Sequence, residues 1–132
     1  MCDDQSKNYF HVISRGINKQ IIFEEDKDYQ RYLKYLKKYS ISYNVDIVAY
    51  CLMTNHIHIL VYAETQQISM MMKCVNQCYV NGYNIKYNRS GSLMQNRPKK
   101  LLVSNPKYLV TVFYYILNNP YRSSICETDK YP

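Results

Sequence analysis

Long apolar runs, glycine-rich stretches and proline-rich stretches are all missing from this sequence. Its 132 residues hold only three glycines and four prolines, so no linker divides the chain and we expect one domain spanning residues 1–132. No run of about eighteen apolar residues is present, which argues against a transmembrane helix. Residues 1–4 lack the basic region and apolar stretch that open a secretory signal. These absences together predict a cytoplasmic globular protein.

A disulfide framework and a zinc ribbon are also missing, although the chain holds five cysteines. Their number is odd and none forms a C-x-x-C pair, so we expect reduced thiols rather than closed bridges. Cys74 and Cys78 lie four residues apart in a predicted helix, where they are either two metal ligands or part of a packed face. The packed face is favoured because free cysteines are among the most buried residue types.

Tryptophan is absent and acidic residues are few, whereas tyrosines and basic residues are plentiful. Seventeen Lys and Arg stand against ten Asp and Glu, which gives a net charge of +7, and the chain has 16 tyrosines. Residues 89–100 hold four basic residues and no acid. Basic side chains interleaved with tyrosines can bind the phosphates of a nucleic acid and stack on its bases. The composition fits such a partner, and it also fits an ordinary solvated surface.

The apolar pattern predicts four strands and three helices in the order β-α-β-β-α-β-α. The strands are expected over residues 9–14, 45–53, 55–63 and 100–104, and the helices over 26–39, 67–84 and 105–119. Asp26 is the expected N-cap of the first helix, and Asn105 followed by Pro106 opens the last one. Tyr108 and Leu109 are expected on the apolar side of that last helix. The order predicts an α+β fold, a ferredoxin-like split βαβ arrangement with an antiparallel sheet and an added C-terminal helix.

His56 and His58 are the most informative pair in the sequence. Only Ile57 separates them within the third predicted strand. Alternate strand residues share a face, so the two imidazoles are expected side by side, about 6–7 Å apart along the strand. Two such rings can occupy adjacent positions around one metal ion, which then needs a third protein ligand and open positions for water or substrate. The alternative is that both rings are ordinary hydrogen-bonded residues.

Two other classes of enzyme carry catalytic histidines on a strand, and this sequence lacks a residue or motif that each of them needs. A histidine triad would need a third histidine at position 60, where this chain has Leu60. A two-histidine phosphodiesterase would need two separate His-x-Thr/Ser copies, and only one histidine pair is present. Neither class of enzyme is therefore predicted.

Tyr115 and Asn119 form a second candidate pair near the end of the last predicted helix. They are spaced i, i+4, so they lie on one helix face. A tyrosine can act as a covalent nucleophile, and a metal held by His56, His58 and the Asn119 amide oxygen would lie within reach of the attacked phosphate. In a chain with 16 tyrosines, packing and capping roles are the simpler interpretation of these two residues taken alone.

Four segments in order resemble the motifs of the single-tyrosine HUH transposases, and within them the REP-associated group. The segments are residues 9–20 (pattern YHVxxRGxNxQ), 49–60 (AYCLMPNHxHLL), 91–97 (GxLFQGRF) and 115–120 (YIxxNP). Thr54 stands where the second pattern has proline, and Asn96 and Pro98 depart from the third. The resemblance extends over nearly the whole chain.

The resemblance implies a DNA transposase that cuts single-stranded DNA, often beside a hairpin, and rejoins strands. His56 and His58 would hold a divalent metal, Mg²⁺ or Mn²⁺, and Asn119 would complete its site. Tyr115 would attack the scissile phosphate, forming a 5′-phosphotyrosine link and freeing a 3′-hydroxyl. Contacts with DNA phosphates are expected from five basic residues: Arg15, Arg89, Arg97, Lys99 and Lys100.

The resemblance leaves three features open. Family members commonly continue beyond the equivalent of residue 132, so we expect this chain to lack a C-terminal tail. The tyrosine helix is supplied across a homodimer in the insertion-sequence branch, whereas REP-associated members are more often described as monomers. A catalytically silent DNA-hairpin-binding module and a metal-dependent RNA-processing nuclease are the alternative functions. The presence of all four site residues together favours the DNA enzyme.

Overall fold

The chain folds into helices packed on both faces of an antiparallel sheet. The computed structural model describes residues 6–95, 97–117 and 124–128, with side chains described up to Thr111. The strands are β1 (Asn8–Arg15), β2 (Asp46–Met53), β3 (His56–Ala63), β4 (Lys99–Leu102) and β5 (Ser124–Thr128). The helices are α1 (Asp26–Ser42), α2 (Thr65–Lys86) and α3 (Pro106–Leu117), with a 3-10 turn at Ile17–Lys19. None of the helices in these ranges is long and apolar enough to cross a membrane.

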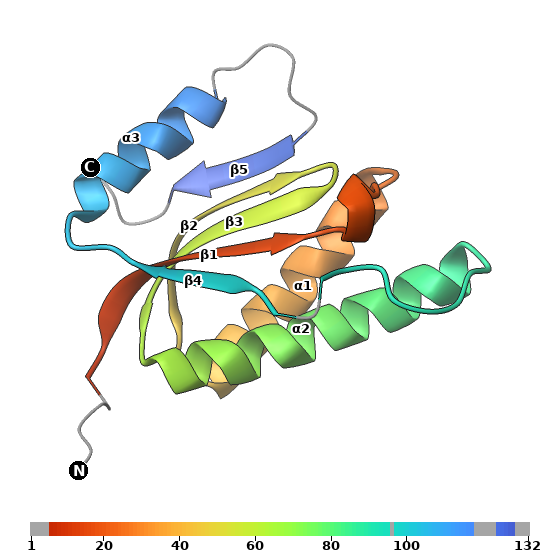
Figure 1. Cartoon of the computed structure of the whole chain (residues 1–132), viewed down its shortest axis with the longest axis horizontal. Helices are drawn as coiled ribbons and strands as arrows, with labels where there is room; N and C mark the ends of the chain where they lie inside the picture. The colour runs from red at the N-terminus through yellow and green to blue at the C-terminus, as the bar shows by residue number, and fades with distance from the viewer. Residues whose placement is uncertain (1–5, 96, 118–123, 129–132) are drawn as a thin grey trace.

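The strands form one sheet in the order β4-β1-β3-β2-β5. β1 pairs with β3 along its full length, from Asn8 opposite Ala63 to Arg15 opposite His56. α1 and α2 cover one face of the sheet, and α3 lies on the opposite face (Figure 1). The predicted α+β fold is confirmed, since β1-α1-β2-β3-α2-β4 is the split βαβ order.

The larger core lies between the sheet and the helices α1 and α2. Alternate residues of β3, Ile57 and Ile59, are fully buried against Met71 and Val75 of α2 in this cluster. Successive strand side chains point to opposite faces, so the intervening residues of β3 face the other way. The histidines of β3 are among those intervening residues, and the apolar alternation of the strand therefore decides on which face they lie.

A smaller cluster on the opposite face holds α3 against the sheet. Leu109 and Val110 of α3 pack with Leu60 of β3 and Ala49 of β2. The prediction that Tyr108 lies on the apolar side of this helix is wrong, because its side chain is 69% exposed. The pair that faces the sheet is Leu109 and Val110, and this pair sets the rotation of α3 about its axis.

The beginning of α1 differs by one residue from the prediction, whereas the beginning of α3 agrees with it. Glu25 rather than Asp26 is the N-cap of α1. Asp28, in the first turn, accepts a hydrogen bond from the backbone N–H of Glu25 at 3.3 Å, which draws the cap position back by one residue. At α3, the Asn105 side-chain oxygen accepts a hydrogen bond from the Lys107 N–H at 3.1 Å, as the predicted cap requires.

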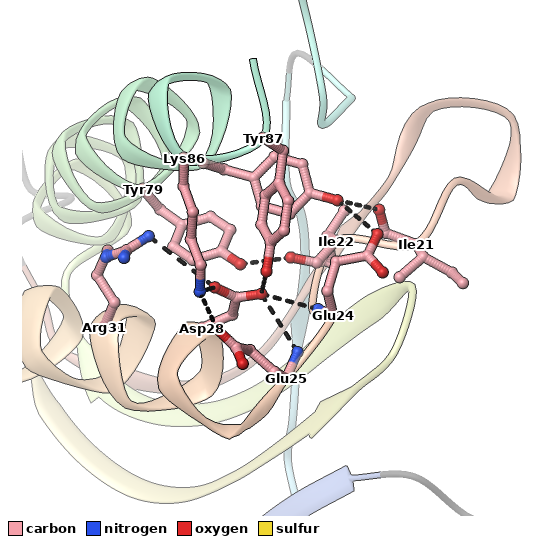
Figure 2. A network of polar contacts seen from close by, with 10 residues as sticks. Ile21, Ile22, Glu24, Glu25, Asp28, Arg31, Tyr79, Lys86 and Tyr87 are labelled. Carbon is pink, nitrogen blue, oxygen red and sulfur yellow. Dashed lines mark hydrogen bonds and ion pairs between the residues drawn. The ribbon is translucent and has the colours of Figure 1, made fainter. Parts of the chain in front are cut away.

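A buried carboxylate, Asp28, ties α1 to the end of α2 (Figure 2). Lys86 donates to it at 2.8 Å, the Tyr87 hydroxyl at 2.6 Å and the Glu24 backbone N–H at 2.9 Å. Burial alone would raise the pKa of Asp28, but these donors outweigh that effect and leave its pKa below the ordinary value. The carboxylate is therefore charged at neutral pH and stabilises the α1–α2 packing.

At the β5 edge of the sheet, the structure differs from the sequence-based expectation in two ways. No strand is predicted over residues 124–128, yet β5 pairs there with β2. Cys51 of β2 is disulfide-bonded, so the prediction of reduced thiols is wrong for this residue, and the β2–β5 register places Cys126 opposite it. Cys78 and Cys74 are free cysteines that lie 3.5 Å from the hydroxyls of Tyr39 in α1 and Tyr43 just after it, in agreement with the packed-face interpretation.

Candidate active site

His56 and His58 lie side by side at the beginning of β3, on the face of the sheet that carries α3. Their ring centroids are 4.8 Å apart and their planes are nearly perpendicular, at 81°. Both side chains are half-buried, whereas Ile57 between them is fully buried on the opposite face. The structure thus brings the two imidazoles together on a rigid central strand, as strand alternation requires.

The hydrogen bond of His56 defines which of its ring nitrogens can bind a ligand. Its Nδ1 lies 2.7 Å from the side-chain oxygen of Asn55. That oxygen can only accept a hydrogen bond, so the Nδ1 of His56 carries the proton. In the neutral ring this leaves the lone pair on Nε2, the nitrogen available to a metal.

His11 is a third histidine at this site, and the sequence analysis missed it. Its Nε2 lies 2.9 Å from Nδ1 of His58, and the two rings stack with centroids 5.0 Å apart. When Nδ1 of His58 is the donor, the lone pair of His58 is on Nε2, matching His56. Metal-binding histidines commonly use their second nitrogen in this way. The alternating pattern of β1 could have shown on which face of that strand His11 lies. Only the β1–β3 register shows that His58 lies on the same face of the sheet.

Burial and positive neighbours keep these rings neutral. Burial lowers the pKa of His11, and burial together with the Arg15 charge lowers the pKa of His56. For His58, burial and then the neighbouring His56, His11 and Arg15 lower the pKa to about 4. All three imidazoles are therefore uncharged at neutral pH, which is the protonation state of a histidine ligand.

Three of the five predicted DNA-binding residues gather next to the histidine pair. Arg15 pairs with His56 across the β1–β3 ladder. Arg15, Arg97 and Lys99 line a small hollow of about 80 Å³ together with Gln95. The hollow lies on the histidine face of β1, so a phosphate bound near His56 would meet positive charge from several directions.

The other two predicted DNA-binding residues, Lys100 and Arg89, lie elsewhere. Lys100 is opposite Val12, which faces the helices, and its ammonium donates to the Ser69 hydroxyl of α2. Arg89 donates to the Asn84 side chain at 2.6 Å and to the Ser92 carbonyl at 3.1 Å. The Arg89 contacts hold the turn that follows α2, away from the histidine pair.

Tyr115 is part of α3, whereas Asn119 lies outside the described residues. α3 is anchored over Leu60, two residues beyond His58, so it crosses the same face of the sheet as the histidine pair. Position 115 is seven residues after Tyr108, and at about 100° per residue these two Cα positions lie on the same side of the helix. That side is opposite Leu109 and Val110, which contact the sheet, and the side chain of Tyr108 is largely exposed there.

The described side chains supply two metal ligands rather than a complete site. Within residues 6–95, 97–117 and 124–128, no group of three or more His, Cys, Asp or Glu is arranged to hold a metal ion. Nε2 of His56 is left available by its hydrogen bond, and so is Nε2 of His58 when its Nδ1 donates to His11. A third protein ligand has to come from another residue type or from outside the described ranges.

Residues 4–119 of the chain match the family model described as transposase IS200 like. The chain belongs to the IS200-like transposase family. This match includes the histidine strand, the hollow lined by Arg15 and the tyrosine helix. The predicted transposase family is therefore confirmed, and the candidate site lies within the part of the chain that defines it. No curated protein matches the chain.

Two solved structures show the same fold as this IS200-like transposase. One is a REP-associated tyrosine transposase bound to a REP hairpin, with a TM-score of 0.58 and 16% identity over 89% of this chain and 68% of that one. The other is a protein from Deinococcus radiodurans R1 assigned as a transposase, with a TM-score of 0.57 and 20% identity over 85% of this chain and 90% of that one. At these identities the likeness establishes the arrangement of helices and sheet.

Proposed function

We propose that this chain is a DNA transposase that cuts and rejoins single-stranded DNA through a covalent 5′-phosphotyrosine intermediate. Membership of the IS200-like family supports the transposase role. The single observation that carries the proposed chemistry is the pair of neutral imidazoles, His56 and His58, whose Nδ1 atoms are both hydrogen-bonded. Arg15 lies beside this pair, as phosphate chemistry requires, because phosphoryl transfer depends mainly on positioning and on neutralisation of charge.

The donor set of the site fits a divalent metal. Two neutral imidazoles provide nitrogen ligands, and the Asn119 amide oxygen is our proposed third ligand. The remaining positions would be filled by phosphate or water oxygens, so a mixed set of this kind suits Mn²⁺, or Mg²⁺ where oxygens predominate. When bound, such an ion neutralises charge on the scissile phosphate.

Tyr115 is the proposed nucleophile. Its phenolic oxygen forms a bond to phosphorus, and the bond between phosphorus and the 3′ oxygen breaks. The proton lost by the phenol is balanced by the proton that the departing 3′ oxygen takes up. The 3′-hydroxyl can later attack the phosphotyrosine link in the reverse sense and reseal a strand, so the reaction needs no external energy source.

The proposed substrate is single-stranded DNA next to a hairpin. The solved REP-associated transposase with the same fold is bound to a REP hairpin. In the present chain, Arg15, Arg97 and Lys99 supply a positive surface beside the histidines, which supports binding of the strand that is cut.

The rotation of α3 favours a homodimer in which Tyr115 of one copy serves the histidines of another. Leu109 and Val110 turn their side of the helix towards the sheet of the same copy. Position 115 lies on the opposite side of α3, which a second copy can approach. A monomer would need α3 to turn about its axis before Tyr115 could reach His58.

A denaturing gel tests the function. The protein is incubated with labelled hairpin DNA that carries a single-stranded flank, in the presence of Mn²⁺, and a covalent protein–DNA band is expected. Tyr115→Phe removes the nucleophile and should abolish the band. Tyr108→Phe, an exposed tyrosine on the same side of the same helix, is the matched control and should leave the band unchanged.

The alternative functions give different results in the same assay. Tight hairpin binding without a covalent band, under several divalent metals, would identify a silent DNA-binding module. Cleavage of RNA without a covalent link would identify a nuclease. A band that persists in Tyr115→Phe would contradict the assignment of the nucleophile.

A further inference from the structure

A groove of about 840 Å³ runs along α2, away from the histidine face of the sheet. The chain leaves α2, turns back and runs alongside the helix before it enters β4 (Figure 1). Residues 92–95 of this returning segment form one wall, and α2 forms the other. Its apolar lining, which we call the floor, includes the partly exposed Val80 and Pro98 and the buried Met72, Leu93 and Met94.

The rim of the groove combines positive charge with side-chain amides. Lys73 and Arg97 are exposed at the rim, and Gln77 and Asn81 are exposed along the α2 wall. None of the residues that line the groove is an Asp or Glu. Cations favour phosphates, and amides can make paired hydrogen bonds to the edges of bases. The apolar floor offers a surface against which a flat base can pack.

The groove is continuous with the basic hollow beside the histidines. Gln95 and Arg97 line the groove and also line the hollow that contains Arg15. Arg15 in turn pairs with His56 across the β1–β3 ladder. A strand that lies at the histidine pair could therefore pass Arg97 at the β4 edge of the sheet and continue into the groove, with cations along its whole course.

We propose that this groove binds unpaired nucleotides of the DNA strand that is cut at the histidine site, with bases against Val80 and Pro98 and phosphates at Lys73 and Arg97. The inference rests on the proposed function, because it takes the same strand as its ligand. A duplex is disfavoured, because its outer surface is charged backbone and would leave the apolar floor uncovered. Gln77 and Asn81 would then read the base edges and contribute sequence preference.

Fluorescence anisotropy of short labelled oligonucleotides, without metal and without a hairpin, tests the groove. Lys73→Glu should weaken binding of single-stranded oligo-dT about five- to tenfold and lower the slope of log affinity against log salt by about 0.7. Lys37→Glu on α1 makes the same charge change at another exposed lysine and should leave the affinity within about twofold. Gln77→Ala should change the relative affinities for oligo-dA, oligo-dC and oligo-dT.

Photo-crosslinking locates the binding site directly. Oligonucleotides that carry 4-thiothymidine should crosslink to peptides of α2 and residues 92–95, and Lys73→Glu should reduce the yield. Crosslinks confined to β-strand peptides, equal affinities of Lys73→Glu and Lys37→Glu, or equal binding of a duplex would each overturn the inference.

The outcomes separate this inference from the proposed function. If the wild-type protein forms the covalent band but crosslinks only outside the groove, the proposed function stands and the inference about the groove is wrong. If crosslinks form in the groove but no covalent band appears, the proposed enzymatic function is wrong and the groove is still a binding site for single strands. Tyr115→Phe should abolish the band and leave oligonucleotide binding unchanged.

Discussion

At the scale of single residues, the candidate site depends on a hydrogen bond between histidines of two different strands. His11 of β1 contacts Nδ1 of His58, while Asn55 contacts Nδ1 of His56. The Asn55 contact directs the lone pair of His56 to Nε2, and the His11 contact does the same for His58 when Nδ1 of His58 is the donor. In the proposed metal site, His11 would be a positioning residue that acts through His58.

Replacing His11 should weaken metal binding. In His11→Leu the Nδ1 of His58 loses its partner, and we expect Mn²⁺ affinity to fall about 10- to 100-fold. Titration calorimetry measures this without any reaction. His11→Gln offers a side-chain amide to His58 and should recover part of the affinity, whereas Tyr9→Phe, on the same strand and face, should have none of these effects. An unchanged affinity in a folded His11→Leu protein would show that His11 has no role in orienting His58.

At the scale of elements, two contacts set the frame around the site. The apolar alternation of β3 buries Ile57 and Ile59 under α2 and so turns His56 and His58 to the opposite face. On the helix side, Asp28 joins the first turn of α1 to the end of α2 through Lys86 and Tyr87. The packing of α1 against the end of α2 is stabilised by this buried carboxylate in its charged form.

Asp28→Asn should destabilise the fold by about 2 kcal/mol at neutral pH, because the Lys86 charge loses its buried partner. Urea unfolding at pH 7 measures the change. Asp26→Asn alters an exposed carboxylate two residues earlier in the same helix and should cost less than about 1 kcal/mol. Equal effects of the two substitutions would contradict the structural role of Asp28.

The same carboxylate makes stability depend on pH in the acidic range. The folded pKa of Asp28 is below its ordinary value of 3.8, so the folded state binds this proton less readily than the unfolded state. Its contribution is complete above about pH 3.8 and is lost as the pH falls through the lowered folded pKa. We expect the stability difference between wild type and Asp28→Asn to shrink below pH 3.8, as urea unfolding at a series of pH values would show. A difference that stays constant as the pH is lowered well below 3.8 would contradict this prediction.

At the scale of the whole molecule, the rotation of α3 on the sheet bears on the proposed homodimer. Leu109 and Val110 hold one side of the helix on the sheet, and position 115 lies on the other side. This rotation is the reason why the proposed function includes a second copy as the source of the tyrosine.

Mixing two inactive variants tests the shared site. His58→Ala lacks the metal site and Tyr115→Phe lacks the nucleophile, so each alone should give no covalent band with hairpin DNA. Mixed together, they should recover about a quarter to a half of the wild-type band if one copy supplies the tyrosine to another. Recovery should be lost on dilution below the dimer dissociation constant. A mixture as inactive as its components, at high protein concentration, would show that each copy uses its own tyrosine.

The charge distribution of the whole molecule predicts a salt-sensitive interaction with DNA. The net charge is +7, and Arg15, Arg97 and Lys99 meet beside the histidines. Replacing each by alanine should lower the slope of log affinity against log salt by about 0.7 for single strands, with little sequence dependence. Lys37→Ala, at an exposed lysine of α1, is the control and should leave the slope unchanged. Equal slopes in all four variants would show that the hollow does not contact DNA phosphates.

The elements and their order were predictable because local patterns define them. Asn105 before Pro106 predicts the beginning of α3, and the alternation around Ile57 predicts that the two histidines share one strand face. The resemblance of the motifs gave the transposase family, which the family match confirms. β5 was not predictable in this way, because a five-residue edge strand is specified by its pairing with β2 rather than by its own pattern.

By itself the sequence determined the strand that carries His56 and His58, the helix that carries Tyr115 and the basic residues around them, because periodicity, caps and charge are properties of neighbouring residues. The tertiary structure alone decided which distant residues meet. The β1–β3 register brings His11 to His58 across 47 positions of the chain, and the packing of Leu109 and Val110 sets the rotation of α3 on the sheet. Register and helix rotation are chosen by burial of apolar side chains between elements, and no local pattern contains that information.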